Sequence, residues 1–151
     1  MRMQTGDRDA QPGTPTVYVV DDDPAMRASL GWLLESMGLP VRTAANAAEF
    51  LRTCPQDARG CLVLNVHMPG MGGLALQEEL LRREQHLPIL MITGYVDPGE
   101  MARAMRRGAF DFVEKPFDDE ALLASVRAAL RQDDKRRRQR AERAGGGPKG
   151  G

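Results

Sequence analysis

Short apolar runs alternate with helical patterns along most of the chain, and this alternation predicts a parallel sheet. Each apolar run suits one buried strand, whereas the segments between them repeat apolar residues at helical spacing. Predicted strands cover residues 16–21, 41–44, 61–65, 88–93 and 110–115, and predicted helices cover about 23–37, 47–53, 74–85, 98–107 and 118–130. The pattern therefore predicts an α/β fold with helices on both faces of its sheet.

Capping residues mark the predicted helix ends. The predicted N-caps are Asp23, Asn46 and Asp118, and a proline follows Asp23. Side chains of these types accept hydrogen bonds from the first backbone N–H groups of a helix. Gly38 and Gly108 are placed to end helices, because glycine adopts the left-handed conformation that helix termini favour.

Polar side chains at the carboxyl ends of the strands are the candidates for function, because ligands of parallel α/β sheets bind there. These residues are Asp21, Asp22, Asn65, Thr93 and Lys115. Adjacent carboxylates suit Mg²⁺, and a lysine with a hydroxyl could hold phosphoryl oxygens. The alternative is that the acidic run 21–23 only caps the first helix, which explains Asp23 but neither of its neighbours.

Composition narrows the class of protein. A chain of 151 residues suits one domain, and an aromatic content of 5% disfavours a base-stacking surface. No apolar run approaches a bilayer span, and the first residues lack the apolar centre of a signal peptide. Cys54 and Cys61 match no metal or redox spacing. Together these features predict a cytoplasmic protein with reduced thiols.

The zero net charge divides unevenly between body and tail. Residues 131–151 hold eight Lys/Arg against three Asp/Glu, so a tail of +5 follows a body of −5. We expect residues 1–14 and about 141–151 to be disordered, because both are polar and rich in Gly and Pro. No apolar stripe continues past Leu130, so the basic segment should not pack as another core helix. It is either a helical extension that links to an output domain or a nucleic-acid-binding arm.

Four segments in order resemble the receiver domain of two-component response regulators. They are VVDDD (19–23), VLNVHMPGMGG (63–73), MITGY (91–95) and FDFVEKPF (110–117). The similarity covers about residues 15–130 and is greatest to FixJ-type receivers, which a helix-turn-helix DNA-binding domain usually follows. It implies a doubly wound, flavodoxin-like sheet of five strands in the order 2-1-3-4-5.

The resemblance also implies roles for individual residues. Mg²⁺ would be held by Asp22, by Asp21 through water, by the backbone carbonyl of His67 and, more weakly, by the amide of Asn65. Thr93 would be the switch hydroxyl, Phe112 the switch aromatic and Lys115 the phosphate-binding lysine. Pro116 matches the Lys–Pro pair that a cis peptide bond commonly joins in this family.

The implied partners are proteins. A histidine kinase or phosphotransfer protein would dock on the first helix, and a homodimer would use the fourth helix, fifth strand and fifth helix. Trp32 lies about 200° around the first helix from Leu30, so it should be exposed opposite the core stripe. It is either an anchor for the partner or a side chain lying over its surface neighbours.

Asn65 departs from the family, which has the phosphate-accepting aspartate at this position. A neutral amide is no comparable nucleophile, so we expect no acyl phosphate and weaker Mg²⁺ binding. The chain would then be a signalling module without enzyme activity that acts through protein contacts. Asn65 is either natural, as in a pseudo-receiver, or a deliberate block in a fragment of a LuxR-type DNA-binding response regulator.

Overall fold

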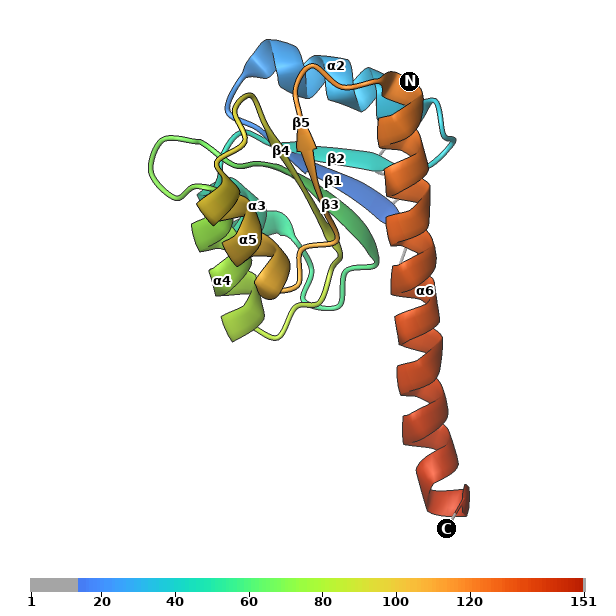
Figure 1. Ribbon diagram of the computed structural model, residues 1–151. Coiled ribbons are helices and arrows are strands. Elements are labelled where there is room, and N and C mark those ends of the chain that lie inside the picture. Colours follow the sequence, from blue (N-terminus) through green and yellow to red (C-terminus); the bar gives the residue numbers. More distant parts are fainter. Residues whose placement is uncertain (1–13, 151) are drawn as a thin grey trace.

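A five-stranded parallel sheet forms the centre of the molecule (Figure 1). The computed structural model describes residues 14–150, with side chains for residues 14–144. The elements in order are β1 Thr16–Val20, α2 Pro24–Glu35, β2 Val41–Ala44, α3 Ala47–Thr53, β3 Gly60–Asn65, α4 Gly73–Arg82, β4 Ile89–Thr93, α5 Pro98–Arg106, β5 Asp111–Glu114 and α6 Asp119–Gly150. The strand order β2-β1-β3-β4-β5 confirms the fold class and the topology that the resemblance implied.

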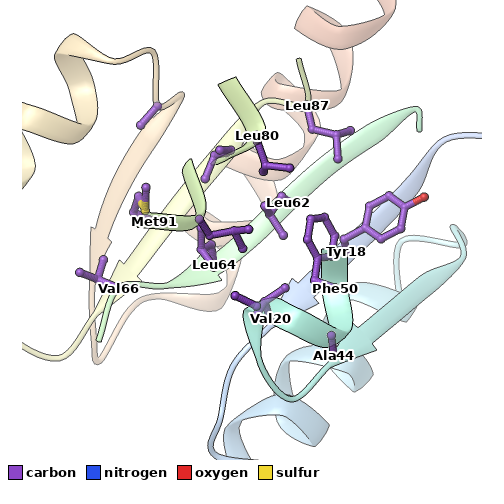
Figure 2. Packing of buried hydrophobic residues seen from close by; sticks show 14 of the residues in the cluster. Tyr18, Val20, Ala44, Phe50, Leu62, Leu64, Val66, Leu80, Leu87 and Met91 are labelled. Atoms are coloured by element: carbon purple, nitrogen blue, oxygen red, sulfur yellow. The ribbon is translucent and has the colours of Figure 1, made fainter. Parts of the chain in front are cut away.

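Helices cover both faces of the sheet, so the central strands are buried on each side. Val17 and Val19 of β1 pack with α2 and α6, whereas Tyr18 and Val20 pack with α3, α4 and α5. On the second face the rings of Tyr18 and Phe50 meet edge to face, with centroids 5.7 Å apart (Figure 2). Two apolar layers therefore hold the strands in register and position their carboxyl ends.

The predicted caps form. Asp23 accepts a hydrogen bond from the backbone N–H of Ala25 at 3.0 Å, and Asn46 accepts one from Glu49 at 2.8 Å. Asp118 likewise accepts from Ala121 at 2.9 Å. Each side chain satisfies a backbone donor that has no partner within its own helix.

The last helix continues past residue 130, which agrees with the helical extension that was one of the two interpretations of the basic segment. In Figure 1, α6 runs past the sheet and projects away from it. Residues 141–150 are helical in backbone, which differs from the disordered tail that their composition predicted. An established helix extends without a new nucleus, and each added residue other than proline can donate one more intrahelical hydrogen bond. The other predicted disordered residues, 1–13 and 151, lie outside the described residues.

A buried carboxylate fastens this extension to the body. Asp133 is 3% exposed and accepts a hydrogen bond from the backbone N–H of Gly60 at 2.9 Å. It also pairs with Arg136 at 2.7 Å and with Arg137 at 3.0 Å. Gly60 is required here, because its φ is +126° and a Cβ would lie 1.8 Å from the carbonyl oxygen of Thr16.

The two arginines complete what we call the α6 clasp, defined as Asp133, Arg136 and Arg137. Arg136 donates to the backbone carbonyl of His86, and Arg137 donates to that of Ala58. The segment beyond Leu130 therefore packs against the body through polar contacts. Up to residue 144 it does not join either apolar cluster, as predicted, whereas its polar contacts were not predicted.

Two further sequence expectations can be compared with the fold. Both cysteines are free, and burial raises the pKa of Cys54 to about 11 and that of Cys61 to about 12. Neither thiol is therefore activated as a thiolate near neutral pH. Within residues 14–150, no helix has both the length and the apolarity that crossing a bilayer requires.

We expect Asp133→Ala to lower the free energy of unfolding by about 2–3 kcal/mol, because a buried N–H and two guanidinium groups lose their acceptor. Asp134→Ala is the matched control. Its side chain is 53% exposed and pairs with Arg138 at 3.3 Å, so its loss should cost less than about 1 kcal/mol. Urea unfolding of the two variants measures the difference. Equal effects would show that the clasp contributes nothing specific.

Candidate functional site

The register between β1 and β3 brings the candidate residues together. Val20 pairs with Leu64, so the residues that follow, Asp21 and Asn65, emerge side by side at the carboxyl edge of the sheet. The chain then returns closely behind Asn65, since a Cβ on Gly73 would lie 2.8 Å from the Asn65 carbonyl oxygen. A glycine at position 73 therefore lets α4 begin directly behind this edge.

Asp21 is the buried acid of the site, with 1% of its surface exposed. Its Oδ1 accepts from the backbone N–H of Asp23 at 2.9 Å. Its Oδ2 has no hydrogen-bond partner and lies 4.0 Å from Nζ of Lys115. Burial raises the pKa of Asp21 above its ordinary value, and the Asp23 N–H and the Lys115 ammonium offset this only in part. Asp22, by contrast, is exposed.

The side-chain nitrogen of Asn65 lies among three oxygen atoms. Nδ2 is 3.0 Å from the backbone carbonyl oxygen of His67, 3.2 Å from Oδ1 of Asp22 and 3.5 Å from Oδ1 of Asp21. These are the groups to which the resemblance assigned the metal. The Asn65 side chain is therefore a hydrogen-bond donor to the acidic pair and not a further acceptor beside it.

Thr93 lies at the end of β4 and is fully buried. Its hydroxyl donates to the backbone carbonyl of Tyr95 at 2.9 Å and lies 3.4 Å from Nδ1 of His67. Nε2 of the same imidazole is 3.0 Å from Oε1 of Glu100, in the first turn of α5. His67 therefore connects the loop after β3 with Thr93 and α5.

Lys115 and Phe112 come from the last strand and the loop after it. Lys115 points its ammonium group toward Asp21, and its peptide bond to Pro116 is cis, as the resemblance implied. Phe112 is partly buried and packs against the apolar cluster beneath α3, α4 and α5. This position agrees with a switch aromatic, although a role in switching stays a prediction.

The oxygen set fits a hard divalent cation. Two carboxylates and a backbone carbonyl converge, and Oδ2 of Asp21 is a buried acceptor without a hydrogen-bond donor. Mg²⁺ prefers such oxygen ligands and keeps several waters. The residues that would hold it are Asp21, Asp22 and the carbonyl of His67. Asn65 could add its oxygen only by turning its amide over.

The sequence correctly placed Asp21, Asp22, Asn65, Thr93 and Lys115 at one edge of the sheet. The side chain of His67 is 54% exposed, but it makes a contact that the sequence did not predict. Its pairing with Glu100 spans 33 positions, and no local pattern connects a loop histidine with the start of a distant helix. Asp133 was missed for the same reason.

Comparison with known proteins decides the family. The model of the response regulator receiver domain family matches residues 17–127. This chain belongs to that family. The transcriptional regulatory protein FixJ of Azorhizobium caulinodans is 46% identical over 128 residues, which cover 85% of this chain and 61% of FixJ. Nodulation protein W of Bradyrhizobium diazoefficiens is 48% identical over 121 residues, which cover 80% of this chain and 53% of that protein.

A solved structure agrees with the sequence matches. The response regulator StyR aligns with a TM-score of 0.83 and 41% identity, over 87% of this chain and 67% of that chain. The aligned part of this chain spans only 53% to 61% of the length of the two curated relatives, FixJ and nodulation protein W. Receiver domains generally bind Mg²⁺, interact with histidine kinases and can dimerise.

We expect Asp21→Asn to raise the melting temperature at neutral pH in EDTA. The pKa of Asp21 is raised in the folded domain, so ionisation above that pKa costs folding free energy that a neutral amide avoids. Below the ordinary carboxyl pKa the aspartate is protonated in both states, and the gain should disappear. Melting curves between about pH 3 and pH 8 measure this trend. A destabilised Asp21→Asn at neutral pH would mean that the Lys115 ion pair outweighs the burial.

Proposed function

We propose that this receiver domain accepts no phosphoryl group and signals by binding partner proteins. One observation carries the proposal: the residue at the end of β3 is Asn65, and its side-chain nitrogen faces the acidic pair. Receiver domains of this family have an aspartate at the position of Asn65, and its carboxylate attacks phosphorus. The Asn65 amide is no comparable nucleophile, because it carries no negative charge and its nitrogen lone pair is delocalised into the carbonyl.

The other residues of the pocket support the proposal that the phosphate site is intact apart from its acceptor. Lys115 would bind a phosphoryl oxygen, and the buried Thr93 hydroxyl lies near the same edge. A bound Mg²⁺ would supply charge neutralisation for phosphoryl oxygens. Asn65 removes one of three negative charges, so we propose that the cation binds more weakly than in a receiver with aspartate at this position.

The Asn65→Asp variant should accept phosphate from acetyl phosphate with Mg²⁺, because it adds the missing nucleophile beside Asp21 and Lys115. Intact-mass spectrometry should show one added phosphoryl group on this variant and none on the unaltered protein. A double variant, Asn65→Asp with Lys115→Ala, is the control and should label much more slowly.

One result would contradict the proposal that Asn65 accepts no phosphate, and another would contradict the proposal that the rest of the pocket is intact. Labelling of the unaltered protein would show that Asn65 does not block phosphorylation, and peptide mapping would identify the residue that reacts. Failure of a well-folded Asn65→Asp variant to label would show that the pocket has lost more than its acceptor. The second result would favour a natural pseudo-receiver over a single block.

We propose that α2 is the docking surface for a histidine kinase or phosphotransfer protein. Trp32 on this helix is 81% exposed, which confirms its predicted exposure. A shallow hollow beside it is lined by Ser29, Leu30, Leu33, Phe117 and Asp119. A large exposed aromatic beside such a hollow is typical of a binding hot spot.

Trp32→Ala should weaken binding to the phosphotransfer domain of a histidine kinase by at least about 2 kcal/mol if Trp32 anchors the contact. It should leave the melting temperature almost unchanged, because little of the side chain is buried. Leu34→Ala is the contrasting variant, since Leu34 is fully buried and its loss should cost about 2–5 kcal/mol of stability. Titration calorimetry and thermal unfolding separate the two effects. Unchanged binding by Trp32→Ala would exclude it as an anchor.

Dimerisation and nucleic-acid binding are further possibilities for which the structure offers unequal support. The proposed dimer face, α5–β5–α6, carries the exposed side chains of Met101 and Met105. Two arginines of the basic extension already bind the body, since Arg136 and Arg137 donate hydrogen bonds to its backbone carbonyls. These contacts favour a linker that continues α6 toward an output domain over a free nucleic-acid-binding arm.

A further inference from the structure

We propose that the side-chain NH₂ group of Asn65 acts as an internal substitute for a divalent cation. In this arrangement the acidic pocket is held in place without metal. The inference rests on the proposed function only in taking this edge of the sheet as the receiver pocket. It goes further, because it assigns Asn65 a structural role in place of a merely missing nucleophile.

The hydrogen-bond geometry is the first support. An amide nitrogen has two hydrogens, and the contacts at 3.0 Å to the His67 carbonyl and 3.2 Å to Asp22 use both of them. Oδ1 of Asp21, at 3.5 Å, lies at the outer limit of the same group. One nitrogen thus lies among oxygens contributed by three separate residues, as a cation would.

The charges around the pocket are the second support. Asp21 and Asp22 are adjacent, and the Lys115 ammonium approaches only Oδ2 of Asp21, at 4.0 Å. Oδ1 of Asp22 and the carbonyl oxygen of His67 lie beyond that ammonium group, and they face the positive end of the Asn65 amide dipole instead. The reverse amide orientation would place a fourth oxygen against these three acceptors and leave the two N–H donors turned away from them.

A competition with metal follows. A divalent cation at these oxygens would have to displace both N–H donors and would gain the Asn65 oxygen only after the amide rotates. With aspartate at position 65 the balance reverses, because three carboxylates would face one another without the two N–H donors of Asn65, and the Asp23 N–H and the Lys115 ammonium reach only Asp21. That variant needs a cation to offset the repulsion, whereas the unaltered domain does not.

Thermal unfolding in EDTA and in millimolar MgCl₂, at matched ionic strength, tests the inference. The unaltered domain should melt at the same temperature in both buffers, within about 1 °C. Asn65→Asp should melt lower than the unaltered domain in EDTA and rise by at least about 3 °C with Mg²⁺. Asn65→Ala, which lacks the donors, should also melt lower in EDTA.

Asn65→Asp combined with Asp22→Asn is the site control and should lose most of the Mg²⁺ response. An Mg²⁺-induced rise in the unaltered domain as large as that of Asn65→Asp would overturn the inference. So would an Asn65→Ala variant as stable as the unaltered domain in EDTA. Failure of the proposed function has a separate signature, namely phosphoryl labelling of the unaltered protein, which none of these melting curves measures.

Discussion

The parallel pairing of β1 with β3 is the constraint on which the rest of the site depends. Because Val20 lies opposite Leu64, the next residue of each strand enters the same small volume at the carboxyl edge. Burial of both sheet faces fixes this register, since a slip of one residue would turn every apolar side chain of a strand to the other face. An acid and an amide are thereby held within hydrogen-bonding distance at a site that solvent only partly reaches.

This arrangement makes the choice of residue at position 65 decisive. Asparagine and aspartate have nearly the same shape, so the substitution leaves the strand and the loop behind it undisturbed. The electrostatic change is large, because a donor replaces a negative charge beside Asp21 and Asp22. We therefore propose that the Asn65 amide partners the acidic pair from within the pocket and that the domain acts through protein contacts.

Periodic features of the sequence predicted most of the fold. The apolar alternation placed all five strands, the caps at Asp23, Asn46 and Asp118 placed helix starts, and the polar strand ends placed the candidate site. The resemblance supplied the strand order. These features are local or repetitive, so a single sequence displays them.

The contacts that the sequence did not predict are single polar pairs between distant segments. Asp133 meets Gly60 across 73 positions and His67 meets Glu100 across 33. A buried carboxylate that accepts one backbone N–H leaves no periodic signal, and the basic run around it looks like a solvated helix face. The direction of the Asn65 amide was equally hidden, because it depends on which acceptors the folded loops bring to it.

The most direct measurement is nuclear magnetic resonance of the asparagine side chains. The chain contains only Asn46 and Asn65, so isotope-labelled asparagine yields two NH₂ groups, with the exposed helix cap Asn46 as an internal reference. We predict that the Asn65 NH₂ protons exchange slowly with solvent, resonate away from those of Asn46 and stay unchanged when millimolar Mg²⁺ is added. Asn65 protons that exchange as fast as those of Asn46, or that shift as Mg²⁺ binds, would contradict this account.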